Sequence, residues 1–151
     1  MKKEIVMTVC LKVPDTTAIT ALQTLLKMGY KNIADVKRHD YYKFFIEGNP
    51  DDFMKKISKV DILVNANKHV FSFDMQKNDY IKILVRNTDD TGDGLLSTLK
   101  NRLCFKNIAK IEKGILWNLS INSDTKNALK IAEKAAKELL VNENYQEYSI
   151  L

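Results

Sequence analysis

Alternating apolar and polar positions open the chain and predict a strand followed by a helix. Residues 5–11 are apolar on both faces of a strand, which is typical of a strand covered on both sides. Residues 18–26 then carry apolar side chains at helical spacing, and Asp15 or Thr16 can cap this helix. Gly29 follows, where glycine readily takes the left-handed conformation that ends a helix.

The longest alternating stretch, residues 33–47, predicts a second strand. Its polar stretch 37–40 indicates that the strand either bends or splits into a hairpin. An asparagine cap followed by proline then opens a second helix, with an apolar stripe over residues 53–64 and a stop at Asn65. Residues 70–73 predict a further strand.

The second half of the chain repeats this order of elements. The predicted elements are a strand at 80–85, a loop at 87–94, a helix at 95–103, a long strand at 115–121, a helix at 128–139 capped by Ser123 or Asp124 and ended by Asn142, and a strand at 148–151.

Two short motifs recur in the same order in the two halves. The Lys-Asn-Ile-Ala of residues 31–34 returns at 106–109, which is 75 positions later. The Leu-Val-Asn-Ala-Asn of residues 63–67 returns as Leu-Val-Asn-Glu-Asn at 140–144, which is 77 positions later. Nearly equal offsets predict an internal repeat.

The repeat predicts an α+β fold made of two domains, residues 1–76 and residues 77–151. Each repeat reads β-α-β-α-β, which becomes the ferredoxin-like order if the middle strand splits. We expect a mostly antiparallel sheet with helices on one face. The other sheet face is apolar as well, so the repeats are predicted to pack as an internal pseudo-dimer, either sheet on sheet or edge to edge.

Composition and charge favour a soluble cytoplasmic protein. The chain has 151 residues, of which 45% are hydrophobic and 28% charged, and its net charge is +5. The lysines are scattered without a basic block, so we expect no nucleic-acid partner. No apolar run is long enough for a membrane span, and the N-terminus reads as a strand rather than a signal peptide. Cys10 and Cys104 are expected to be buried free thiols.

Candidate chemistry along the chain is sparse. His39 and Asp40 are adjacent in a strand and point to opposite faces, so they do not form a working pair. The acidic loop 89–94 lacks the spacing of a calcium loop and reads as a turn with a helix cap. Aromatic residues on the strands read as core or interface rather than as a base-stacking surface. We therefore expect no catalytic residues, no cofactor and no metal.

Several short motifs nevertheless carry a resemblance to a known family. They are Leu-Lys-Met-Gly-Tyr at 26–30, Ile-Ala-Asp-Val-Lys at 33–37, Leu-Lys at 11–12, Leu-Leu-Val-Asn at 139–142 and Glu-Tyr at 147–148. In order and spacing the chain resembles the PurS family, the small subunit of phosphoribosylformylglycinamidine synthase. The resemblance covers both halves, so the chain looks like two PurS units in tandem.

The chain departs from the family pattern in several places. The arginine of the family's middle strand is replaced by Lys37 in the first half and Glu112 in the second. The Gly-Lys pair that follows it is not kept, and the second half retains only Gly114.

The resemblance implies a scaffold subunit without an active site of its own. It would bridge the glutaminase (PurQ-like) and synthase (PurL-like) subunits of an ATP-dependent glutamine amidotransferase ligase in de novo purine biosynthesis. We expect the docking surface near Lys12, Asn65, Arg86 and Asn142, and a further homodimer stays open.

Two other functions fit the same order of elements. A tandem ACT-like module would sense an amino acid near a glycine after the first strand, where this chain has Pro14 and Asn87. RNA binding through the aromatic strands is the third alternative, and it predicts a strongly salt-dependent affinity.

Overall fold

The structure, a computed structural model, describes residues 2–75, 78–90 and 92–151. In the N-terminal half the elements are β1 (Lys3–Leu11), α1 (Thr16–Lys27), β2 (Ile33–Ile46), α2 (Pro50–Ile57) and β3 (His69–Ser72). In the C-terminal half they are β4 (Ile81–Asn87), α3 (Asp93–Asn101), β5 (Ile108–Ile121), α4 (Thr125–Ala135), a π-helical turn η1 (Ala136–Leu140) and β6 (Gln146–Ile150). The predicted α+β class is confirmed.

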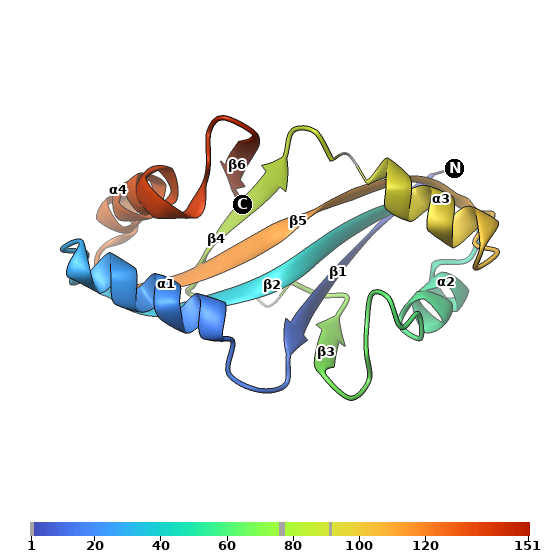
Figure 1. The fold of residues 1–151 in the computed structure, drawn as a ribbon, viewed down its shortest axis with the longest axis horizontal. Helices are drawn as coiled ribbons and strands as arrows, with labels where there is room; N and C mark the ends of the chain where they lie inside the picture. The colour runs from blue at the N-terminus through green and yellow to red at the C-terminus, as the bar shows by residue number, and fades with distance from the viewer. Residues whose placement is uncertain (1, 76–77, 91) are drawn as a thin grey trace.

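The six strands of the described residues form one antiparallel sheet in the order β3-β1-β2-β5-β4-β6 (Figure 1). The long strands β2 and β5 lie side by side at its centre, and the short strands β3 and β6 form its edges. The sheet is therefore continuous across the two halves of the chain.

The central strands pair along almost their whole length. Residue pairs run from Ile33 opposite Ile121 to Ile46 opposite Ile108, with irregularities only near the two ends. Both strands have 14 residues. Asp40 lies opposite Ile115, and these two positions are 75 residues apart in the sequence.

The hairpin alternative for the middle strand is wrong, because β2 runs unbroken through the polar stretch 37–40. These four residues keep strand alternation, so two of them face the helices and two face the opposite side. Both sets lie in the middle of the sheet, between the places where the helices pack, and polar side chains there need no break in the strand.

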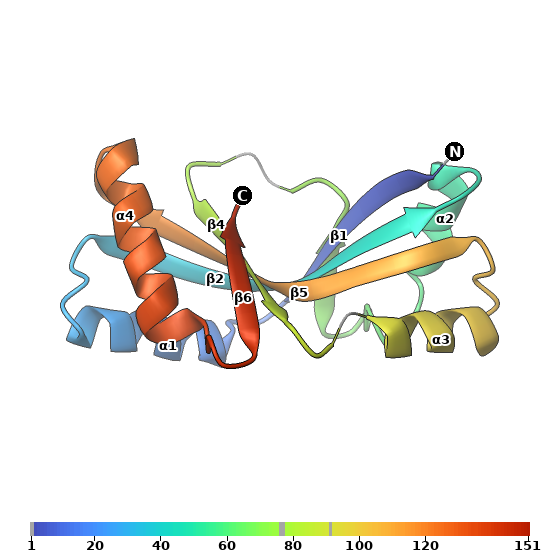
Figure 2. The ribbon, with the colours of Figure 1, turned by 90° about the horizontal axis from the view of Figure 1, so that it is seen from above.

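The four α-helices seen in the described part of the chain cover one face of the sheet as two pairs, each with one helix from either half (Figures 1 and 2). Helices α2 and α3 close a core at one end of the sheet, around Phe44, Phe53 and Leu99. Helices α1 and α4 close a second core at the other end, around Leu25 and Trp117. Each core thus combines both halves, and the prediction of helices on one face is confirmed.

The opposite face of the sheet has a smaller apolar cluster. Tyr41, Leu84 and Leu116 are buried there, and Val6 and Met75 pack against them. Because the second half extends the sheet sideways, a sheet-on-sheet cover does not form. The segment that connects the halves covers part of this face instead, through Met75.

The second helix is shorter than its apolar stripe predicts. α2 ends at Ile57, and turns follow up to Val64, so the prediction of a helix that Asn65 stops is wrong. Val60 and Val64 are nevertheless buried in the same core as Ile57. The apolar pattern therefore predicted correctly which residues are buried, but it predicted a helix where the chain forms turns.

Helix ends largely follow the sequence signals. Asp15, Asn49 and Asp124 cap α1, α2 and α4 by accepting backbone hydrogen bonds. Gly29 takes a positive φ of 103° after α1. The corresponding position after α3 is Cys104, whose φ of 61° also lies in the left-handed region that disfavours most side chains.

The predicted boundary between the two domains, at residues 76 and 77, lies outside the described residues. No helix of the described chain is both long and apolar enough to cross a membrane.

Candidate functional site

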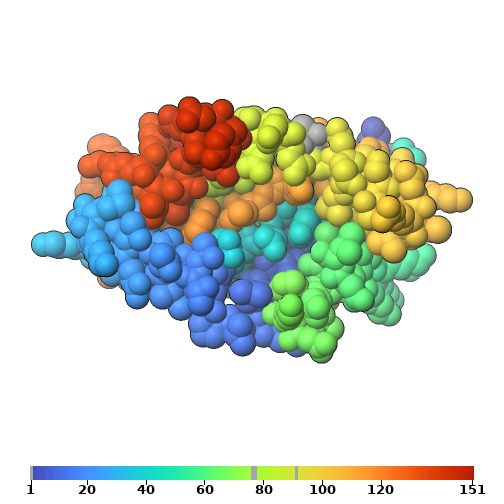
Figure 3. All heavy atoms as spheres, viewed as in Figure 1, coloured from blue at the N-terminus to red at the C-terminus, as the bar shows by residue number. Residues whose placement is uncertain are grey.

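A cavity of about 440 Å³ opens where β1 parts from β2. The two strands stay paired as far as Val9 opposite Asp40, after which β1 turns away while β2 continues along β5. Figure 3 shows the hollow between the atoms of the N-terminal segment, in blue, and those around β3, in green. Its size suits a small organic molecule.

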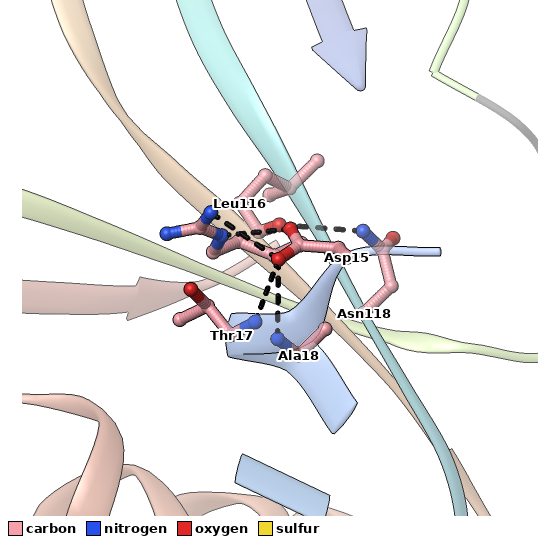
Figure 4. Close-up of polar contacts among 6 residues, drawn as sticks. Asp15, Thr17, Ala18, Leu116 and Asn118 are labelled. Atoms are coloured by element: carbon pink, nitrogen blue, oxygen red, sulfur yellow. Dashed lines mark hydrogen bonds and ion pairs between the residues drawn. The ribbon is translucent and has the colours of Figure 1, made fainter. Parts of the chain in front are cut away.

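The helix side of the cavity is organised by Asp15. One carboxylate oxygen accepts hydrogen bonds from the backbone amides of Thr17 and Ala18, at 2.9 and 3.3 Å (Figure 4). The other oxygen pairs with Nε of Arg38 at 3.0 Å. Pro14 precedes this cap and carries no amide hydrogen that would compete for the carboxylate. Asp15 therefore ties the start of α1 to the middle of β2.

The opposite side of the cavity has a row of polar side chains across three strands. Asn118 on β5 lies opposite Lys37 on β2 and opposite Lys82 on β4. Neighbouring strands are about 4.8 Å apart, so both lysines flank the buried Asn118. The amide of Asn118 donates to the carbonyl of Leu116 at 3.4 Å (Figure 4).

Both lysines contact polar or aromatic groups of the segment that enters β4. Nζ of Lys37 lies 5.3 Å from the centre of the Tyr80 ring, and Nζ of Lys82 donates to Asn78 at 3.0 Å. Neither ammonium forms an ion pair with a carboxylate of the described residues. The Tyr80 hydroxyl also donates to the Asp35 carboxylate at 2.7 Å, so this part of the sheet holds two cations and one nearby acidic group.

Two titratable side chains that line the cavity, His39 and Cys10, have shifted pKa values. Burial lowers the pKa of His39, and the positive charges of Lys37 and Lys82 lower it further, while Asp40 acts in the opposite direction. Burial raises the pKa of the Cys10 thiol, against an opposing effect of Lys37. At neutral pH both side chains are therefore uncharged, and Cys10 is a poor nucleophile.

The C-terminal half has a gap at the matching place, and an ionic network fills it. Strand β4 stays paired with β5 as far as Val85 opposite Ile115. Arg86 then pairs with Glu112 at 3.1 Å and with Glu147 at 3.4 Å. By strand register, Arg86 stands where the first half has Cys10, Glu112 where it has Lys37, and Glu147 where it has Val70.

Close strand packing is a second difference between the two gaps. A Cβ atom on Gly114 would lie 2.6 Å from the carbonyl oxygen of Val85, which leaves no room for a side chain. The matching position in the first half is His39, which lines the cavity. Glycine thus lets β4 close on β5, whereas a side chain occupies the corresponding space beside β1.

The four predicted docking residues fall into two separate groups. Lys12 and Asn65 lie together, because Nζ of Lys12 donates to the Ala66 carbonyl at 2.6 Å, in the turn that Asn65 begins. Arg86 and Asn142 lie in the other half, on β4 and on the turn before β6.

The asparagines of these two groups have matching structural roles. The amide of Asn65 donates to Nδ1 of His69 at 3.0 Å, and the amide of Asn142 donates to the side chain of Gln146 at 2.9 Å. Arg86 is held in its ionic network. Of the two cations among the four residues, Lys12 is exposed and Arg86 is partly buried.

Other candidates from the sequence have structural roles. His39 and Asp40 face opposite sides of β2, as expected, and Phe44 and Trp117 belong to the cores. In the acidic loop, Asp90 pairs with Lys113 at 2.7 Å, and α3 begins directly after Gly92. Thr91, in the same loop, lies outside the described residues.

The cysteine prediction is wrong in its burial. Both thiols are free, but Cys10 is only partly buried and Cys104 is exposed. Cys104 lies in the turn after α3, at the surface, with a positive φ of 61°.

The sequence gives no warning of the row formed by Lys37, Asn118 and Lys82. The three residues lie on three strands far apart in the chain, and only strand register brings them together. The polar stretch 37–40, which predicts a bend or a hairpin, includes Lys37 but says nothing about Asn118 or Lys82.

In comparisons with known proteins, no family model matches the chain and no curated protein matches it. Among the described residues, no group of three or more histidine, cysteine or acidic side chains is placed to hold a metal ion.

Proposed function

We propose that this chain is a covalent pseudo-dimer of two PurS-like repeats and serves as a scaffold subunit of phosphoribosylformylglycinamidine synthase. The observation that supports it is the pairing of β2 with β5. Residues 75 positions apart meet at Asp40 and Ile115, so each strand presents the same stretch of its repeat to the other. Self-complementary contact of this kind is what joins two identical subunits across a two-fold axis.

Hydrogen bonds on both sides of this pair repeat in the same way. The amide of Glu47 donates to the carbonyl of Asn107 at 3.0 Å, and the amide of Asn122 donates to the carbonyl of Asn32 at 2.7 Å. Each bond maps onto the other when the halves are exchanged, because both matched pairs are 75 residues apart.

The outer strands support the same relation. The amide of Lys12 donates to the carbonyl of Lys68 at 2.8 Å, and the amide of Thr88 donates to the carbonyl of Tyr145 at 2.9 Å. Two halves that keep such details despite different side chains fit a duplicated ancestral unit.

The scaffold role is tested by co-expression with the glutaminase and synthase subunits of the same organism, with glutamine and magnesium-ADP present. We expect a complex that survives size-exclusion chromatography. Replacing the exposed Lys12 by glutamate should weaken it, whereas Lys31→Glu, which makes the same change of charge at an exposed turn, should not. If wild-type protein elutes alone under these conditions, the scaffold proposal is wrong.

The ACT-like alternative stays a prediction, although the cavity beside β1 bears on it. An amino acid needs an acceptor for its ammonium group as well as cations for its carboxylate. Asp15 is the one carboxylate among the described residues that line the cavity, and Arg38 and the start of α1 already engage it. The cavity chemistry therefore favours a ligand without an ammonium group.

A further inference from the structure

We propose that the cavity between β1, β2 and β3 is a binding site for a small organic anion with an apolar body. Lys37 and Lys82 would hold the acidic headgroup beside Asn118, and the apolar body would lie against the side chains at the start of α1. This inference is independent of the scaffold proposal, since the cavity is formed by this chain alone and its occupation requires no partner subunit.

The first argument is the placement of charge. Lys37 and Lys82 approach the same buried amide, Asn118, from the two neighbouring strands. The two lysines are two strand spacings apart, about 9.6 Å, so an acidic group placed over Asn118 would lie between them. A carboxylate or phosphate between two ammonium groups would form charge-assisted hydrogen bonds, which are stronger than neutral ones.

The second argument is the distribution of polar and apolar walls. The lysines and His39 line the cavity from the sheet face that lies away from the helices. Val13 and Ile19 line it at the start of α1 and Phe71 lines it from β3, and all three are exposed although they are large and apolar. Exposed apolar surface beside a cationic end is the pattern of a site for an amphipathic ligand.

The third argument is the contrast with the matching gap in the other half. There the positions of Lys37 and Lys82 are taken by Glu112 and Val6, and Asn118 is matched by Lys43. That row has one acidic, one basic and one apolar side chain, and Lys43 also pairs with Glu4 at 3.3 Å. A row of two cations around an amide is therefore particular to the cavity and is not a general feature of the sheet.

The test uses four naphthyl compounds whose intrinsic fluorescence reports binding by polarisation. Naphthylacetate and naphthyl phosphate supply the two acidic headgroups, naphthylethanol is the uncharged analogue, and naphthylalanine carries an additional ammonium group. We expect at least one of the two anions to bind, and the better of them identifies the headgroup. The affinities of the alcohol and of the amino acid should be lower by a factor of at least about ten. The alcohol has no negative charge for the lysines to bind, and the ammonium group of the amino acid offsets its carboxylate.

Two variants locate the binding. Lys37→Gln with Lys82→Gln should weaken the anion about tenfold or more, whereas Lys43→Gln with Lys110→Gln removes the same charge from the same sheet face outside the cavity and should leave binding unchanged. The triple change Cys10→Arg, Lys37→Glu and Val70→Glu copies the closed network of the other half and should abolish binding. Circular dichroism checks that each variant is folded.

Several results would overturn the proposal. They are binding of neither anion to the wild-type chain, equal affinity for the alcohol, stronger binding of the amino acid, and equal losses in the two lysine pairs. Because no glutaminase or synthase subunit is present, none of these results depends on the scaffold role.

Discussion

The gaps beside β1 and β4 share a backbone design and differ in what fills them. Each opens after a matched residue pair, Val9 with Asp40 and Val85 with Ile115. In the first gap a cavity remains, with two lysines that have no carboxylate partner among the described residues. In the second, Arg86 reaches two carboxylates and β4 closes on a glycine. A few side chains therefore determine whether the gap between these matched strands is open or closed.

Both gaps also keep one interaction in common, a carboxylate that ties the loop after the first strand to the long strand. Asp15 pairs with Arg38 at 3.0 Å, and Asp90 pairs with Lys113 at 2.7 Å. This contact survives while the surrounding side chains change, which suggests that it serves the fold, whereas the differing residues are free to serve separate functions.

The largest expected effect comes from putting the side chain of the open gap into the closed one. Gly114→His should lower the free energy of unfolding by about 3 kcal/mol, because its Cβ would collide with the Val85 carbonyl and force β4 away from β5. The reverse change, His39→Gly, should cost about 1 kcal/mol or less, since it only loosens a strand. Urea unfolding measures both, and equal losses would contradict the close-packing argument.

Removing the shared carboxylate should affect the two gaps unequally. Asp15→Ala should cost about 2 kcal/mol, because it removes a helix cap together with a partly buried ion pair. Asp90→Ala should cost less, about 1 kcal/mol, since it removes a more exposed ion pair and a single 3.1 Å hydrogen bond from the backbone amide of Gly92, at the start of α3.

Asp15→Asn is the control for this comparison, because an asparagine still caps α1 but cannot neutralise Arg38. We expect the free energy of unfolding of Asp15→Asn to lie between those of the wild type and of Asp15→Ala. If Asp15→Asn were as unstable as Asp15→Ala, the cap would contribute nothing and the interpretation would be wrong.

The turns after α1 and α3 provide a third comparison. Cys104→Gly should raise the free energy of unfolding by about 0.5 kcal/mol, because relief of the left-handed conformation exceeds the entropy that glycine adds to the unfolded chain. Gly29→Ala should lower it by about 1 kcal/mol, for the opposite reason. Thermal unfolding under reducing conditions measures both, and a loss of stability in Cys104→Gly would contradict the strain.

The smallest expected effect is a pH dependence in the open gap. Burial and the lysines lower the pKa of His39 in the folded state, so the unfolded chain binds the proton more readily. Above the unfolded pKa of 6.5, His39 is neutral in both states and does not change the stability. As the pH falls below 6.5, the unfolded chain takes up the proton first, so the free energy of unfolding decreases.

The measurement compares thermal unfolding of wild type and His39→Gln at several pH values. The stability of the wild type relative to the variant should fall on acidification from about pH 7.5 to about pH 5. Gly114 stands at the matching place in the other gap and carries no titratable group, so that gap should add no such dependence. A difference that stays constant with pH would rule out the shifted pKa.

The sequence predicted the order of the elements, most caps and the helix-covered face, because these depend on local spacing. It mispredicted the end of α2, since Val60 and Val64 are buried at helical spacing although the chain there forms turns. Burial and conformation produce the same pattern when a turn packs against a core, so periodicity alone does not separate them.

The candidate site depends on register, which the sequence does not reveal. Lys37, Lys82 and Asn118 become neighbours only when β5 pairs with both β2 and β4. Each of them alone is an ordinary polar residue on a strand. The sequence shows glycine at position 114 where the first half has His39. Only the structure shows why this matters, because the Val85 carbonyl lies too close to Gly114 for a side chain.

The central pairing of β2 with β5 also constrains how the protein is made. When Asp40, in the middle of β2, leaves the ribosome, the residue opposite it, Ile115, is still 75 positions away in the sequence. Until β5 is synthesised, a strand of 14 residues has one edge with unpaired amides and carbonyls, and such an edge readily pairs with other nascent chains. The charged stretch at residues 37–40 lies in the middle of that edge, where it would discourage wrong pairing during synthesis.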